Sequence, residues 1–184
     1  MAKDKWRIEE AVKIAEDAAL KALRTGGERI ITKAMNNVPF ESGTLRRSAT
    51  TTVGGLPDMM QVYEAAKNGN EMINAFPQPI GKEKAVYVSY NTPYARRQHE
   101  ELGYNHPRGG GPKFLENSFN QLKDDIIESA QKAVKKALQK AQEEAQQNFE
   151  TIIERAREEC DNHIKIAEKN MDQAVSIIIG KVVK

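Results

Sequence analysis

The chain has 184 residues, of which 39% are apolar and 6% aromatic, and this composition predicts a modest core with an extended helical part. Its formal net charge is +2, and neither half has the basic excess that is typical of nucleic-acid-binding proteins. The single cysteine, Cys160, excludes an intramolecular disulfide, and no apolar run approaches the roughly 18 residues of a membrane span. We therefore expect a protein made in a reducing cytoplasm, with no signal peptide and no membrane segment.

A long helix is predicted at the start of the chain. Apolar residues recur at mostly helical spacing over residues 4–36, and Asp4 is a candidate for the N-cap. The pair Gly26-Gly27 interrupts this pattern, because glycine is a poor helix former, and it predicts a break in the helix.

The middle of the chain predicts a small sheet with short helices around it. Residues 39–44 are typical of a turn, in which we expect Gly43 at positive φ. The β-branched cluster after this turn predicts a strand over residues 45–53, and the alternating run at 85–90 predicts a second strand. Residues 57–75 between them predict a short helix.

The last part of the chain reads as helix. A short helix is predicted over residues 94–102, followed by a glycine-rich loop. From Pro112 an apolar stripe advances in steps that average about 3.7 residues, a period that does not favour a left-handed coiled coil. We find no internal repeat. The prediction is an α+β fold, with a small antiparallel sheet packed against N-terminal and C-terminal helices in residues 1–135 and an extended helical tail in residues 136–184.

Three stretches, in this order, resemble a known family. They are VPFESGTLRRS at residues 38–48, YVSYNTPYARRQHE at residues 87–100 and PKFLE at residues 112–116. They are similar to the turn and strand, the strand running into a helix start, and the step into a closing helix of the head-tail joining proteins of long-tailed bacteriophages. These proteins are also labelled tail-completion, minor capsid or tail-component proteins.

The resemblance implies a structural protein of the virion and not an enzyme. Members of the family form rings, commonly hexamers, between the DNA-filled head and the tail, where they contact adjacent neck, connector and tail proteins. It implies no catalytic residues, no cofactor and no metal. Contact with DNA would be incidental and local to the channel of the ring.

The candidate functional residues are those that could mediate assembly. Arginine suits both carboxylate and phosphate partners because its guanidinium binds them in a bidentate manner. The simpler reading of the same arginines is a solvated surface. We expect Tyr94 to pack under the sheet. The predicted subunit or partner interface comprises Arg46, Arg47, Tyr94, Arg96, Arg97, Ile164, Met171 and Ile178, and the predicted structural turns contain Pro39, Gly43 and Pro93.

Two other functions are weighed against assembly in the neck of a virion. A coiled-coil adaptor that acts through the C-terminal helix is the main alternative. A hydrolase would have to use His99 and Glu100, which lack the spacing of a zinc-protease helix. The three histidines, His99, His106 and His163, are too far apart in the sequence to predict a metal site.

Overall fold

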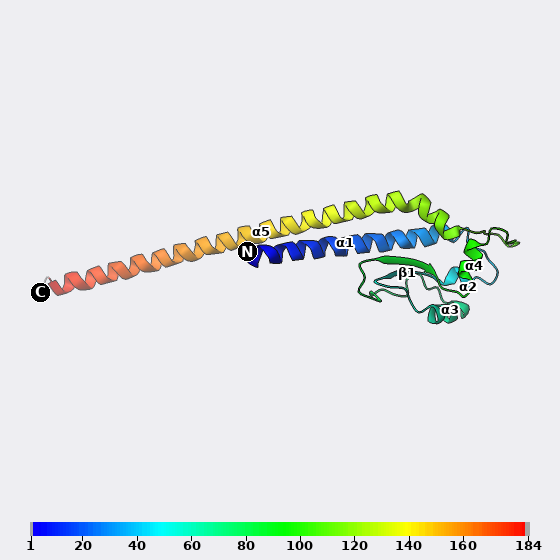
Figure 1. Ribbon diagram of the computed structural model, residues 1–184. Helices are drawn as coiled ribbons and strands as arrows, with labels where there is room; N and C mark the ends of the chain where they lie inside the picture. The colour runs from blue at the N-terminus through cyan, green and yellow to red at the C-terminus, as the bar shows by residue number, and fades with distance from the viewer. Residues whose placement is uncertain (1, 183–184) are drawn as a thin grey trace. The chain divides into compact units, whose positions relative to one another are not determined.

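The computed structural model describes residues 2–182, and the side chains of residues 8–179. The chain divides into two units, residues 1–138 and residues 139–184. Figure 1 shows the predominance of helix, with a two-stranded antiparallel sheet and a C-terminal helix, α5, that runs from Phe114 to Val182. The predicted α+β fold with a long C-terminal helix is confirmed.

Helix α1 (Ala2–Ala34) continues through both glycines, so the predicted break is wrong. It begins before Asp4, whose side chain lies outside the described residues. A Cβ atom on Gly26 would lie 2.5 Å from Cγ2 of Ile126 in α5, and one on Gly27 would lie 2.7 Å from Cγ2 of Thr51 in the sheet. The two glycines therefore allow α1 to approach α5 on one side and the sheet on the other, and this contact offsets their low helix propensity.

The sheet pairs β1 (Ala49–Val53) with β2 (Val86–Tyr90), from Ala49 opposite Tyr90 to Val53 opposite Val86. Helix α1 contacts both strands. The three threonines of β1 are fully buried; the hydroxyl groups of Thr50 and Thr52 form hydrogen bonds, whereas that of Thr51 has no partner among the described residues. Oγ1 of Thr50 lies 2.9 Å from Oγ of Ser89 on the paired strand.

The first part of the predicted strand 45–53 is helical instead. Residues Thr44–Arg47 form α2, a single turn of helix, and the strand begins only at Ala49. Gly43, at φ 78°, redirects the chain immediately before this turn, and the expected positive φ is confirmed. The backbone N–H of Ser48 bonds to the carbonyl of Thr44, which completes the turn. The strand thus coincides with the β-branched cluster, whereas Leu45, Arg46 and Arg47 before it, which are not β-branched, follow the geometry of the turn.

Two further short helices precede and follow β2 in the chain. Helix α3 (Met59–Lys67) is shorter than the predicted 57–75, and the carboxylate of Asp58 caps it by accepting a hydrogen bond from the N–H of Gln61 at 2.8 Å. Helix α4 (Ala95–Glu100) lies within the predicted range 94–102.

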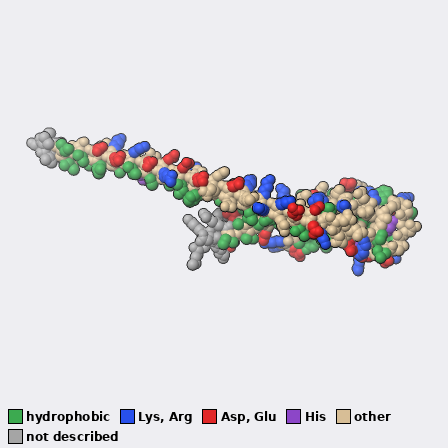
Figure 2. Space-filling model, turned by 90° about the horizontal axis from the view of Figure 1, so that it is seen from above, with side chains coloured by type: hydrophobic (Ala, Val, Ile, Leu, Met, Phe, Trp, Pro, Cys, Tyr) green, Lys and Arg blue, Asp and Glu red, His purple; other side chains and the backbone are tan. Residues whose placement is uncertain are grey.

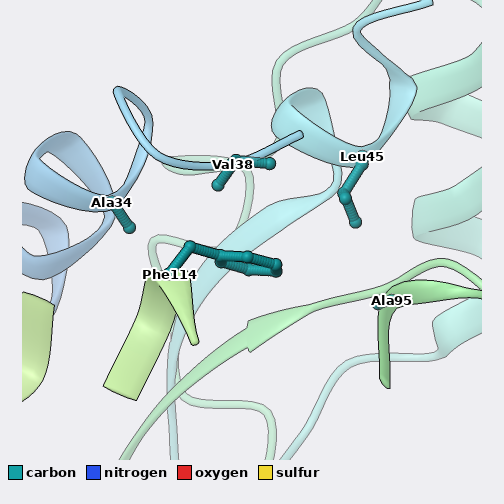
Figure 3. Packing of buried hydrophobic residues seen from close by; sticks show 5 residues of the cluster. All are labelled: Ala34, Val38, Leu45, Ala95 and Phe114. Carbon is teal, nitrogen blue, oxygen red and sulfur yellow. The ribbon is translucent and has the colours of Figure 1, made fainter. Parts of the chain in front are cut away.

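The core of the first unit is small and centres on Phe114, the first residue of α5. Figure 3 shows its ring lying among four apolar side chains from α1, α2, α4 and the segment after α1. The ring of Tyr90 packs edge-on against it, with ring centroids 5.0 Å apart. Burial raises the pKa of Tyr90, so its phenol stays protonated. The buried cluster comprises Ala34, Val38, Leu45, Ala95 and Phe114.

The described residues of the second unit, 139–182, form helix. Every residue from Gln142 to Ile179 is exposed, in contrast to the packed elements of the first unit. Among the helices of the described residues, none is both long and apolar enough to cross a membrane.

Candidate assembly surfaces

The three stretches that carry the family resemblance meet in one core. The first contributes Val38 and Leu45, the second Ala95 and the third Phe114, and all four side chains belong to the same buried cluster. Stretches far apart in the sequence therefore supply the central contacts of the first unit. The residues that the three stretches share with the family therefore include residues that pack against one another in the core.

Arg46 and Arg47 bind backbone carbonyls of their own chain. The guanidinium of Arg46 donates two hydrogen bonds to the carbonyl of Val38, at 2.9 and 3.2 Å, and lies 4.8 Å from the ring centroid of Phe40. The guanidinium of Arg47 donates to the carbonyl of Ala66 in α3, at 2.8 Å. Both side chains are half-buried. Their immediate role is to hold the segments around α2 in place, and both residues are partly exposed.

The second arginine pair is placed differently. Arg96 and Arg97 are exposed on α4, and the only partner of either, within the described residues, is the ring of Tyr104 beneath Arg97, at 5.4 Å. Tyr94 does not pack under the sheet, so that expectation is wrong. It is 37% exposed and meets Tyr63 of α3 edge-on, with ring centroids 6.4 Å apart. The residue that packs centrally is Tyr90, four positions earlier.

His99 and Glu100 connect α4 to the start of α5. Nδ1 of His99 lies 2.8 Å from the carboxylate of Glu100, which also binds the ammonium group of Lys113. The N–H of Glu116 donates to Nε2 of His99 at 3.4 Å, which suits the tautomer with its proton on Nδ1. Hydrogen bonds from Lys113 and His99 hold the pKa of Glu100 below its usual value. Sequence reasoning missed this network, because nothing in the local pattern places Lys113 beside α4.

No candidate metal centre is present in the described part of the chain. No three His, Cys, Asp or Glu side chains gather there in the way that metal ligands do. His106 lies in the loop after α4, whereas His163 lies in α5.

Two grooves lie on the first unit. One, of about 460 Å³, is apolar and lies between α1, β2 and the start of α5, with Leu23, Val88 and Phe119 in its lining. The other, of about 550 Å³, lies between the turn at residues 39–43, α4 and the loop at residues 105–108. Arg108 of that loop donates a hydrogen bond to the carbonyl of Glu41, which ties the loop to the turn.

The second unit presents an apolar stripe without a covering element among the described residues of that unit. Ile164 is 55% exposed, Met171 66% and Ile178 61%. Figure 2 shows hydrophobic side chains gathered along one side of this part of α5 and charged side chains along the other. Burial of apolar surface lowers the free energy by about 25 cal/mol for each Å² that is removed from water. The stripe is therefore the surface from which the largest gain by association is expected.

Comparison with protein-family models, with curated proteins and with solved structures finds no match for the chain.

Proposed function

We propose that this protein is a structural component of the head-tail junction of a long-tailed bacteriophage, a ring-forming connector or tail-completion protein. The observation that carries the proposal is the convergence of the three motif stretches in one core. A chance set of short matches would have no reason to supply neighbouring side chains. Val38, Leu45, Ala95 and Phe114 do so from three separate segments. The proposed form is a homo-oligomeric ring, a hexamer by the same resemblance.

The exposed stripe of the second unit supports a role in assembly. Long amphipathic helices are stabilised chiefly by packing of their apolar face, and in the second unit that face is exposed from Phe149 to Ile179. The exposed pair Arg96 and Arg97 offers a second, polar contact surface on the first unit. In this proposal the first unit forms the ring, and the helix attaches it to a protein partner.

Imaging of complete particles tests the location. A gold or antibody-fragment label on the chain should appear between head and tail, in a number of copies set by the ring. Particles that carry the label elsewhere, or not at all, would exclude this function.

A truncation tests the role of the helix within the same particles. Removal of residues 146–184 should leave the first unit folded, as judged by thermal unfolding, and should reduce the yield of joined heads and tails. Charge reversal of Arg96 and Arg97 provides a second variant, because both side chains are exposed and the one contact described for them is that of Arg97 with the ring of Tyr104. Normal yield of infectious particles from both variants would contradict the assembly roles of these surfaces.

A coiled-coil adaptor remains the second candidate, since the exposed stripe favours it independently of the motifs. An adaptor of this kind would form rods of a few chains and no ring, even with its partners present. Negative-stain images of the purified protein with and without partners distinguish the two.

A further inference from the structure

The exposed part of α5 contains an eleven-residue repeat, contrary to our expectation of no internal repeat. Residues 149–159 read FETIIERAREE, residues 160–170 read CDNHIKIAEKN and residues 171–181 read MDQAVSIIIGK. The first position is Phe, Cys or Met, the second is acidic, and the fifth is Ile, Ile or Val. The eighth is Ala, Ala or Ile. The eleven-residue period therefore appears at four different positions of the repeat.

An eleven-residue period has a defined structural meaning. It corresponds to three turns of about 3.67 residues, and helices that bury such a stripe against one another wind into a right-handed supercoil. The first, fifth and eighth positions fall on one face and form the stripe. Phe149, Ile164 and Met171 are each more than half exposed on it.

We infer that the stripe pairs with the same stripe of a second copy of this chain, parallel and in register, as a right-handed coiled coil. This inference rests on the proposed assembly role of the helix and identifies its partner. A surface on an unrelated globular protein has no reason to match a period of eleven residues over three repeats. A second copy has the same period, because in a parallel pair in register each stripe residue faces the same residue of the other chain.

The charges on the two edges of the stripe select the parallel orientation. The residues directly after the first position of each repeat form an acidic column, Glu150, Asp161 and Asp172. The residues that precede it, on the opposite edge, are Asn148, Glu159 and Asn170. An antiparallel pair would place the acidic column of one helix beside that of the other, and like charges at close range repel. A parallel pair places it beside the mostly neutral edge.

The central cysteine allows the pairing to be measured on the full-length protein. Cys160 is exposed and occupies the first position of the middle repeat, so a parallel pair in register brings two Cys160 side chains together. A disulfide forms only where the Cα atoms approach within about 7 Å. Treatment with a mild oxidant, followed by electrophoresis without reductant, should convert the protein to a covalent dimer.

Moved cysteines test register and orientation. In a Cys160→Ala background, Phe149→Cys and Met171→Cys should each cross-link to themselves. Asn162→Cys, on the opposite face of the helix, is the matched control. Cross-linking at the stripe positions should be about tenfold faster than at the control, because paired thiols are held at high effective concentration.

Two results would overturn the inference. Equal rates at Asn162→Cys and at the stripe positions would mean random collision. Preferential cross-linking of Phe149→Cys to Met171→Cys in a mixture of the two variants would mean an antiparallel pair. Neither result bears on where the protein lies in the particle, which the labelling of virions measures separately.

Discussion

The two units of the chain place their apolar side chains in opposite environments. In residues 1–138 apolar side chains from four segments are buried around Phe114, and polar groups such as the threonines of β1 are buried as well. In residues 139–184 the apolar side chains are more regular in sequence, yet every residue from Gln142 to Ile179 is exposed. Regularity along a helix is thus no measure of packing within the protomer. The first unit buries its apolar side chains within itself, whereas the second leaves them exposed.

The largest expected effect comes from truncating the aromatic residue at the centre of the first unit. Phe114→Ala should lower the free energy of unfolding by about 3–5 kcal/mol, because it removes a ring that is 1% exposed and leaves a cavity. Ile166→Ala, in the second unit and outside the first, fifth and eighth positions of the repeat, is the control. Its side chain is 58% exposed, so the free energy of unfolding should barely change. Denaturant titration of both variants measures the difference. Equal decreases in the free energy of unfolding would contradict the contrast between the two units.

A substitution at the turn before α2 should have the next largest effect. Gly43→Val should destabilise the first unit by about 1–3 kcal/mol, because φ is 78° there and a Cβ atom would also meet the guanidinium of Arg47. Gly103→Val is the control, since a Cβ atom at Gly103 would meet nothing within 4 Å and its φ is not in the left-handed region. Thermal unfolding should separate the two. A melting temperature unchanged by Gly43→Val would show that the turn can rearrange.

The two units should also differ in how much an arginine side chain contributes to the free energy of unfolding. Arg46→Met should cost about 1–2 kcal/mol, because the carbonyl of Val38 loses two hydrogen bonds that water replaces only in part. Arg155→Met, on the exposed helix of the second unit, should be neutral for protomer unfolding. If the two substitutions have the same effect, the contacts of Arg46 do not stabilise the fold.

The smallest expected effect depends on pH. The pKa of Glu100 is lower in the folded chain than its ordinary value of 4.5, because Lys113 and His99 bind its carboxylate. Its contribution is therefore present above pH 4.5 and is lost as the pH falls through the folded pKa. Glu100→Gln should make stability depend less on pH at acidic pH, and Glu154→Gln, at an exposed position of the second unit, is the control that should leave this dependence unchanged. Identical acid limbs for wild type and Glu100→Gln would contradict the network.

Elements with a strong local signal could be predicted from the sequence. The alternation at residues 85–90 predicted β2, and the uninterrupted stripe after Pro112 predicted the long helix. The positive φ of Gly43 could be predicted from its place in the turn.

Features that arise from tertiary contacts could not be predicted in the same way. The local sequence at Gly26-Gly27 indicated a break in the helix. A side chain at these positions would collide with Ile126 and Thr51, which lie more than twenty positions away in the chain, and the local sequence does not show these contacts. Tyr94 and Tyr90 have similar local patterns, and only packing against Phe114 distinguishes them. The partners of Arg46 and Arg47 are backbone carbonyls, which leave no mark in a sequence.

The eleven-residue period limits how the length of the exposed helix can vary. Removal of eleven residues shortens the helix by about 16 Å and rotates the rest of the helix by only about 20°, so the apolar face stays aligned. Removal of five residues would rotate the remainder by about 140° and direct that face away from its partner. Insertions and deletions between Phe149 and Ile179 should therefore survive selection mainly where they return the apolar face to its orientation, as eleven residues do and five do not, so that the helix can serve as a spacer of adjustable, stepwise length.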